Sequence, residues 1–234
     1  MQATDERDTK ARIADAVSHL LSRYWKPIVI GAVIIAVVLI AVFGWIQIQA
    51  NRAEAAAEML DEVEQEIESF EEAEEEERAE AAERVLESAD ELVEQYPRTY
   101  AASRALMFKA EVHWQEERWD EAEQAYLQVA EDHPDKHLAP VALLNAAAAA
   151  EAAESTEEAL SHVDRLIERY GGGDEPLPEA ARALFTKGRL YESLEDYEEA
   201  GASYEQLVDR HPESNWTNLA RNRIIALTTN GLID

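Results

Sequence analysis

The sequence predicts an all-α protein, with a single N-terminal transmembrane helix followed by an α-solenoid of helix pairs. Two observations predict this architecture. An uncharged apolar stretch lies near the start of the chain, and the remainder repeats one helical pattern with terminators at Pro97, Pro134, Gly171 and Pro212. We expect four parts: a tail (1–26), a transmembrane helix (27–48), a helical stem with an acidic linker (49–78), and a solenoid with a C-terminal capping helix (79–234).

The apolar stretch is long enough to cross a membrane. After Pro27 it holds 21 residues without a charge, roughly 31 Å of helix, which is close to the thickness of a bilayer's hydrocarbon core. Pro27 suits a first helical turn, while Trp25 and Trp45 lie where aromatic rings favour the membrane interface. A buried core helix is seldom so uniformly apolar, and a cleavable signal has a shorter apolar region. We therefore expect an uncleaved anchor.

Basic residues near the anchor predict its orientation. Arg52 is the one basic residue that closely follows it, whereas five precede it: Arg7, Lys10, Arg12, Arg23 and Lys26. Because basic flanks stay in the cytoplasm, we expect a cytoplasmic N-terminus and an extracytoplasmic domain. Within the tail, residues 11–25 have apolar side chains at helical spacing. An amphipathic helix on the membrane face and a simple extension of the anchor explain this spacing equally well.

The domain after the anchor is strongly acidic. The whole chain has a net charge of −29, and residues 49–234 carry 46 acidic and 16 basic side chains, a net of −30. Such a domain repels nucleic acid and anionic headgroups and attracts basic partners. The acidity also suggests a salty environment, in which charge repulsion is screened. The absence of cysteine excludes a lipidated cysteine anchor and leaves the redox compartment undecided.

The stem has a narrow apolar stripe formed by Leu60, Val63, Ile67 and Phe70. This spacing fits either a short self-pairing coiled coil or the first helix of the domain packed on its neighbour. We favour the second, because two heptads are few for a stable zipper. The like-charge run at 71–77 is expected to form a solvated turn or a frayed helix end.

The repeats are visible when distant segments are aligned. One set of repeated positions is Gly188, Tyr191, Ala200, Tyr204 and Pro212, and its counterpart is Ala110, His113, Ala122, Tyr126 and Pro134. This pattern resembles the tetratricopeptide repeat (TPR). In it small residues let paired helices approach, aromatic residues fill the gaps, and proline stops the second helix. Stacked pairs then form a solenoid.

Three segments complete the array. The middle repeat departs from the pattern, with Ala150 and Val163 where aromatic residues are usual. Residues 79–97 are expected to pair with the stem helix. Residues 214–229 are expected to form a capping helix, with Ser214 as its N-cap and Gly231 just past its end. Trp216, Leu219, Ile224 and Leu227 should point inward, and Arg221 and Arg223 outward.

The sequence shows no catalytic constellation, so we expect no enzyme, no cofactor and no metal. It has no glycine-rich phosphate loop, no GxSxG and no HExxH. His133 and His137 are four residues apart, but Pro134 breaks the helical geometry that would let them share a metal. His133 and His211 occupy the same repeat position, which favours a structural role in the turn. The acidic residues lack the EF-hand pattern, and Gly171–Gly173 fits an inter-repeat turn.

The TPR resemblance implies a protein-binding groove lined by the first helix of each repeat. By repeat register, the expected lining residues are Arg104, Met107, Glu111, Trp114, Gln115, Leu144, Arg182, Phe185 and Arg189. Met107, Trp114 and Phe185 are the apolar members, and an exposed apolar patch often marks a protein-binding site. The alternative is that the stem or the capping helix covers these side chains.

The architecture as a whole resembles the ancillary subunit family of the bacterial Sec translocon, which are inner-membrane proteins with a periplasmic TPR domain. This resemblance implies a single-pass protein of the bacterial inner membrane. It also implies partnership with translocon subunits, a membrane-anchored periplasmic chaperone, and unfolded or basic clients. The alternative is a TPR scaffold for envelope assembly or cell division, similar to proteins that usually carry cleaved signals or lipidated cysteines. A eukaryotic organellar receptor would usually have the opposite orientation.

Overall fold

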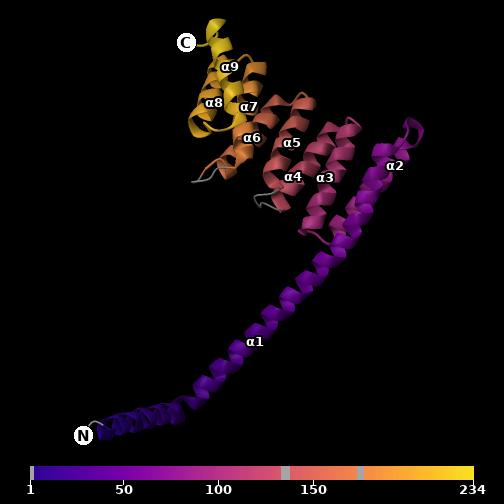
Figure 1. Cartoon of the computed structure of the whole chain (residues 1–234). Coiled ribbons are helices and arrows are strands. Elements are labelled where there is room, and N and C mark those ends of the chain that lie inside the picture. Colours follow the sequence, from indigo (N-terminus) through magenta and orange to yellow (C-terminus); the bar gives the residue numbers. More distant parts are fainter. Residues whose placement is uncertain (1–2, 133–137, 173–176) are drawn as a thin grey trace. The chain divides into compact units, whose positions relative to one another are not determined.

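The computed structural model describes residues 3–132, 138–172 and 177–234, which form helices joined by short turns (Figure 1). Side chains are described from Trp25 onward, except at position 28. No strand occurs in these ranges, which confirms the predicted all-α class. The chain divides into two compact units, Met1–Arg52 and Ala53–Asp234.

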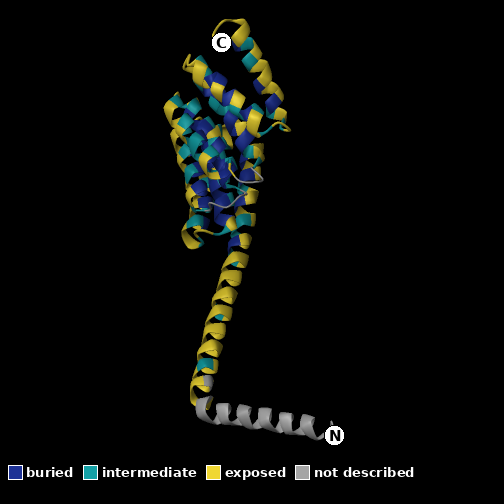
Figure 2. Ribbon diagram, turned by 90° about the vertical axis from the view of Figure 1, so that its left-hand side faces the viewer, coloured by how far each residue is buried: buried dark blue, intermediate teal, exposed yellow. Residues whose placement is uncertain are grey.

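The described residues of the first unit all belong to helix α1 (Ala3–Glu72). The apolar side chains from residue 29 to residue 48 are exposed almost without exception (Figure 2), and the most apolar 18-residue window has a mean hydropathy of 3.0. By length and composition this segment can cross a membrane. Pro27 lies inside α1 rather than in a first turn, so its expected place at a helix start is corrected. An internal proline costs the helix one backbone hydrogen bond.

The second unit begins with the last part of α1, and its described residues continue with eight helices. They are α2 (Glu75–Gln95), α3 (Tyr100–Gln115), α4 (Trp119–Asp132), α5 (Ala139–Ala152), α6 (Thr156–Tyr170), α7 (Pro178–Ser193), α8 (Tyr197–Arg210) and α9 (Asn215–Thr229). From α2 onward each helix packs against the next, and the ribbons stack as helix pairs (Figure 1). The predicted solenoid is therefore present.

The stem stripe packs within this unit. Val63, Ile67 and Phe70 are buried, and Leu60 packs beside them. They contact side chains of α2 and α3, as expected for the first helix of the domain. A helix end falls inside the acidic run, because α1 ends at Glu72, but the break is short. Only Ala73 and Glu74 separate α1 from α2, and the glutamates at 75–77 form the first turn of α2 rather than part of a turn between helices. Negative charge is favourable there because a helix N-terminus carries partial positive charge.

The turns inside the three helix pairs share one geometry. Glu117, Glu154 and Glu195 each have a positive φ of about 60°. The next residue in each turn donates its N–H to a carbonyl five residues earlier, at 2.8, 2.8 and 2.9 Å. This is the Schellman arrangement, which satisfies carbonyls at a helix end. The pairs α3–α4, α5–α6 and α7–α8 therefore turn the same corner.

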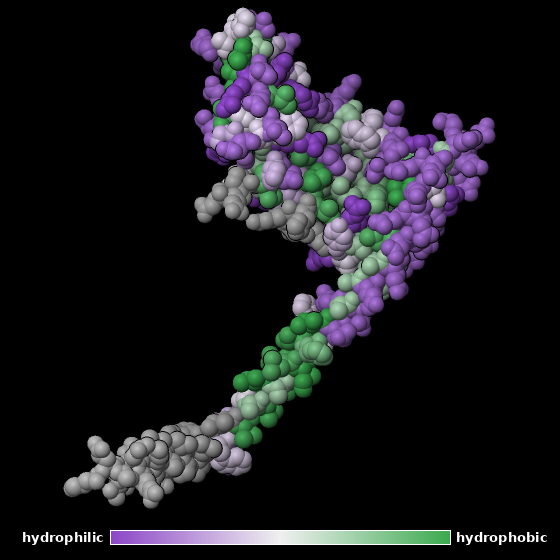
Figure 3. All heavy atoms as spheres, viewed as in Figure 1, coloured by the Kyte–Doolittle hydropathy of each residue, from purple (hydrophilic) through white to green (hydrophobic). Residues whose placement is uncertain are grey.

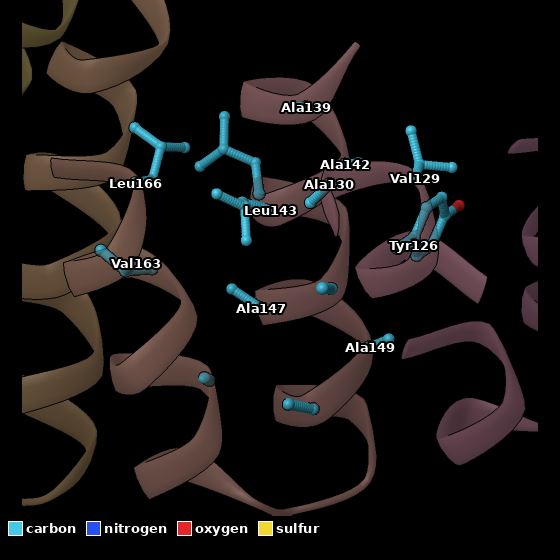
Figure 4. Packing of buried hydrophobic residues seen from close by; sticks show 14 of the residues in the cluster. Tyr126, Val129, Ala130, Ala139, Ala142, Leu143, Ala147, Ala149, Val163 and Leu166 are labelled. Atoms are coloured by element: carbon cyan, nitrogen blue, oxygen red, sulfur yellow. The ribbon is translucent and has the colours of Figure 1, made fainter. Parts of the chain in front are cut away.

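Helix α5 forms the centre of the largest core cluster. Its alanines let α4 and α6 approach closely, and Leu143 packs with Val163 and Leu166 of α6 (Figure 4). Small side chains on one helix and branched ones on its neighbours fill the space between them. The middle repeat thus replaces the usual aromatic residues with an alanine-rich helix.

Close approach is most evident between α7 and α8. A Cβ placed on Gly188 would lie 2.4 Å from the ring of Tyr204, and that ring is fully buried. Only glycine permits this distance, because a real methyl group needs more room. The small residue and the aromatic residue of the repeat pattern are therefore direct packing partners.

The capping helix α9 follows Ser214, whose side chain accepts a hydrogen bond from the Trp216 N–H. Leu227 is buried, while Trp216 and Ile224 are partly buried against α7 and α8. Leu219 is 47% exposed, so the expectation that it points inward is wrong. It lies on the flank of α9 that no described helix covers. Gly231 has φ +69° and follows the helix end, as predicted.

Candidate protein-binding groove

The first helices of the pairs line a single hollow, which we call the α3–α7 groove. Its volume is about 550 Å³, and its lining residues are Arg104, Met107, Phe108, Glu111, Trp114, Gln115, Tyr126, Asn145, Ala148 and Arg182. Helix α3 contributes six of them at helical spacing, so one face of α3 forms one wall. Helices α5 and α7 supply the rest of the wall, with Tyr126 reaching in from α4.

Six of the nine residues expected from the repeat register lie together here. They are Arg104, Met107, Glu111, Trp114, Gln115 and Arg182. The register succeeds for α3 because a straight helix with a well-defined buried face leaves only one face for the groove.

The other three expected residues are placed differently. Leu144 is 4% exposed and belongs to the core, since α5 is contacted by α4, α6 and α7. Phe185 packs against Trp216 of α9 at a centroid distance of 5.2 Å, so the capping helix covers it. Arg189 pairs with Glu151, with 2.5 Å between Nη2 and Oε2, and lies outside the groove.

The register missed Phe108, Tyr126 and Asn145. Asn145 carried a usable signal, because it is the one polar side chain between residues 139 and 150. A lone amide in an alanine-rich helix indicates a polar surface or a polar partner. The repeat pattern assigns the Tyr126 ring to packing between helices. The structure agrees with this assignment, since only 7% of the residue's surface is exposed, and it also places Tyr126 at the groove.

Trp114 is the prominent apolar side chain of the groove. It is 36% exposed, and its ring meets that of Trp119 edge to face at a centroid distance of 4.8 Å. Met107 and Phe108 lie seven and six residues before Trp114, about two helical turns earlier on α3, and are partly exposed. Aromatic and methionine side chains held in place but open to solvent suit protein recognition.

Comparison with protein families agrees with this geometry. Residues 19–172 match the tetratricopeptide repeat-like domain family, and residues 142–215 match the tetratricopeptide repeat. The chain belongs to the tetratricopeptide repeat-like family. Its repeats therefore form a protein-interaction module, and this fold is typically a non-catalytic scaffold.

Other TPR proteins are similar to parts of the chain. A TPR repeat-containing protein of Treponema pallidum is 32% identical over 132 residues, which cover 56% of this chain and 52% of that protein. The chain thus spans about half the length of this relative. A TPR protein structure from Parabacteroides merdae has a TM-score of 0.53 at 18% identity, covering 74% of this chain and 61% of that one.

A second solved structure extends the likeness. The TPR-like repeats of a putative kinesin light chain from Podospora anserina have a TM-score of 0.57 at 14% identity, covering 74% of this chain and 88% of that one. At such low identity these structures show the TPR fold alone.

The α3–α7 groove carries charges of both signs. Arg104 lies over the Phe108 ring at 4.7 Å and 4.0 Å from a carboxylate oxygen of Glu64. Arg182 is exposed and makes no ion pair within the described residues. Glu111 also lines the groove. Burial raises its pKa, and the negative charge of Glu71 adds to that rise. The groove is therefore less acidic than the domain around it.

Polar contacts fix two sides of the groove. Burial raises the pKa of Tyr126 to about 12, so its hydroxyl stays protonated while it hydrogen-bonds with Asn145. Arg78 of α2 donates to Gln115 Oε1 at 2.7 Å and to Glu116 Oε1 at 3.1 Å, and it lies over the Phe70 ring at 4.5 Å. These contacts hold the end of α3 in place before any partner binds.

The described residues contain no cluster of acidic, histidine or cysteine side chains that would hold a metal. His162 pairs with Glu123 at 2.6 Å. The Nδ1 atom of His113 and the Nε2 atom of His211 are buried without hydrogen-bond partners, which indicates packing roles. His133, Pro134 and His137 lie outside the described residues.

Proposed function

We propose that this protein is a membrane-anchored, extracytoplasmic TPR module. In this proposal it binds protein partners in the α3–α7 groove as an accessory factor of the Sec translocon, alongside a membrane-anchored periplasmic chaperone. The observation that carries the proposal is the groove itself. It presents exposed Trp114 and partly exposed Met107 between charged residues on a preformed wall. Apolar anchors with a polar rim are the usual composition of a binding site for a protein segment.

Two further features support the membrane and client parts of the proposal. The exposed apolar segment of α1 is long enough to span a bilayer, and the flanking basic residues favour a cytoplasmic N-terminus. The domain that follows carries a net charge of −30. Long-range attraction would bring basic segments of emerging proteins toward it.

Crosslinking in native membranes tests the proposal. Wild type, Trp114→Ala and Tyr100→Ala chains are crosslinked, and their partners are identified by mass spectrometry. Tyr100 is the matched control because it is 64% exposed, begins the same helix, and does not line the groove. We expect translocon subunits with all three chains, and loss of a chaperone or client only with Trp114→Ala.

Two results would contradict the proposal. If only cell-division or outer-membrane assembly proteins are recovered, the scaffold alternative replaces the translocon role. If Trp114→Ala retains every partner of the wild type, the α3–α7 groove is not the binding site.

A further inference from the structure

The last helix of the array has an uncovered side. Helices α3, α5 and α7 each pack between the helix before them and the helix after them. Among the described residues, α9 packs mainly against α8 and also against α7. Solenoid ends are normally closed by a polar outer face, so the surface at this end shows whether α9 acts as such a cap.

A hollow of about 460 Å³ lies between α8 and α9 at this end, and we call it the α8–α9 groove. Its apolar lining residues are Val208, Ile224 and Ile225. The side chain of Ile225 is 63% exposed, which is unfavourable in water. Figure 3 shows hydrophobic atoms breaking the hydrophilic surface at the C-terminal end of the array. This end is therefore not a polar cap.

The charges that line this groove have both signs. Arg221 of α9 lies with Glu205 and Asp209 of α8, and none of the three forms an ion pair within the described residues. Helix α9 also contains no acidic residue. Elsewhere the domain is so acidic that two copies repel each other. At this groove an arginine on one molecule has carboxylates to meet on another.

We propose that the α8–α9 groove is the surface through which two copies of this chain pair about a two-fold axis. In a two-fold contact the same patch serves both partners, so it must be complementary to itself. The groove meets this requirement, since Ile225 supplies an apolar projection, Val208 and Ile224 an apolar recess, and Arg221 a charge opposite to Glu205 and Asp209. A different protein attracted by its opposite charge would need a groove lined by charges of one sign, whereas this groove carries both.

The membrane anchor that we propose above favours this pairing. Two tethered copies meet at a much higher effective concentration than two free ones. Added salt should strengthen the pair, because it screens the repulsion between the acidic domains more than it weakens contacts buried at close range. A pair held by the rim charges alone would respond in the opposite way.

Single cysteines test the proposal in the full-length chain in native membranes. The chain has no cysteine, so each variant has one thiol. Ile225→Cys places it in the α8–α9 groove, while Leu194→Cys places it at another exposed apolar site, 47% exposed at the end of α7. Under mild oxidation we expect a disulfide-linked species of twice the chain mass for Ile225→Cys and background for Leu194→Cys.

A second measurement removes the thiol chemistry. Ile225→Glu should raise the dissociation constant of the detergent-solubilised pair by about tenfold or more, with Leu194→Glu unchanged, as measured by light scattering at several NaCl concentrations. Circular dichroism checks that both variants are folded. Equal crosslinking at the two cysteines, an Ile225→Cys adduct with a different protein, or a folded Ile225→Glu chain that pairs like the wild type would each overturn the proposal.

Discussion

Residue by residue, the fold depends on contacts that leave little tolerance, and Gly188 is one of them. Its backbone lies against the Tyr204 ring, and an added methyl group would come within 2.4 Å of that ring. We expect Gly188→Ala to destabilise the protein by about 1–3 kcal/mol, because overpacking displaces a fully buried ring. Thermal unfolding measures this loss.

The matched control for that substitution is Gly201→Ala on α8. There the added methyl group would meet the side-chain end of Ile233 at 3.2 Å, which can shift, and alanine favours a helix more than glycine does. We expect a change within about 1 kcal/mol. If both variants lose the same amount of stability, close packing at Gly188 does not explain the loss in Gly188→Ala.

His113 makes the stability depend on pH. Burial, together with the nearby positive charges of Arg118 and Lys109, lowers its pKa from the usual 6.5 to about 4. The unfolded chain therefore takes up this proton first. With respect to this group, the free energy of unfolding is highest above pH 6.5. It declines as the pH falls toward 4, and at pH 5 it is lower by about 2 kcal/mol.

His113→Leu removes this proton uptake and keeps an apolar side chain at the site. We expect the free energy of unfolding of the variant, measured by urea titration at pH 7.5 and pH 5, to fall less than that of the wild type. An equal fall in both proteins would show that His113 is not responsible.

Among the elements, α9 is held to the array by a network around Glu192. The carboxylate accepts from the Tyr204 hydroxyl at 2.5 Å and from Arg223 Nε at 2.9 Å. Burial raises the pKa of Glu192, but the hydrogen bonds from Arg223 and Tyr204 lower it overall. One acidic side chain of α7 thus joins α8 and α9.

Glu192→Gln should loosen α9 without unfolding the array, since an amide loses the charge that attracts Arg223. Hydrogen exchange should become faster across 215–229 and stay unchanged in α5. Glu195→Gln, in the turn after α7, removes an acidic side chain outside the network and is the control. Uniform protection in both variants would contradict a holding role.

The elements also show what the sequence can predict. The helix pairs and the α3 wall follow from spacing, because a repeated pattern of small and aromatic residues specifies repeated packing. The place of Leu144 does not follow, since α5 is enclosed by three helices and its alanine-rich sequence has no polar face to orient it. Phe185 was misplaced because coverage by Trp216 depends on how α9 docks. Asn145 was overlooked although its isolation among alanines was visible.

At the scale of the whole molecule, repulsion among the excess negative charges is the dominant long-range interaction. A net charge of −30 on residues 49–234 favours expansion, and salt screens it over about 8–10 Å at moderate ionic strength. We expect the melting temperature of the full chain in detergent to rise with NaCl up to molar concentration.

Choline chloride at the same ionic strength separates screening from specific sodium binding, because both salts screen charge equally. Similar increases in the two salts support the electrostatic explanation. A melting temperature that stays constant or falls in both salts would contradict it and would also remove the argument for a salty environment.

The shared corner of the three helix pairs has an evolutionary consequence. Since Glu117, Glu154 and Glu195 close equivalent turns with equivalent hydrogen bonds, one pair can in principle be duplicated or lost without a new kind of turn. Gene-level gain or loss of a helix pair would then change the length of the recognition surface in steps. Recombination that adds or removes a helix pair would therefore change the size of the partner that the chain can bind. Point mutations would then adjust the affinity.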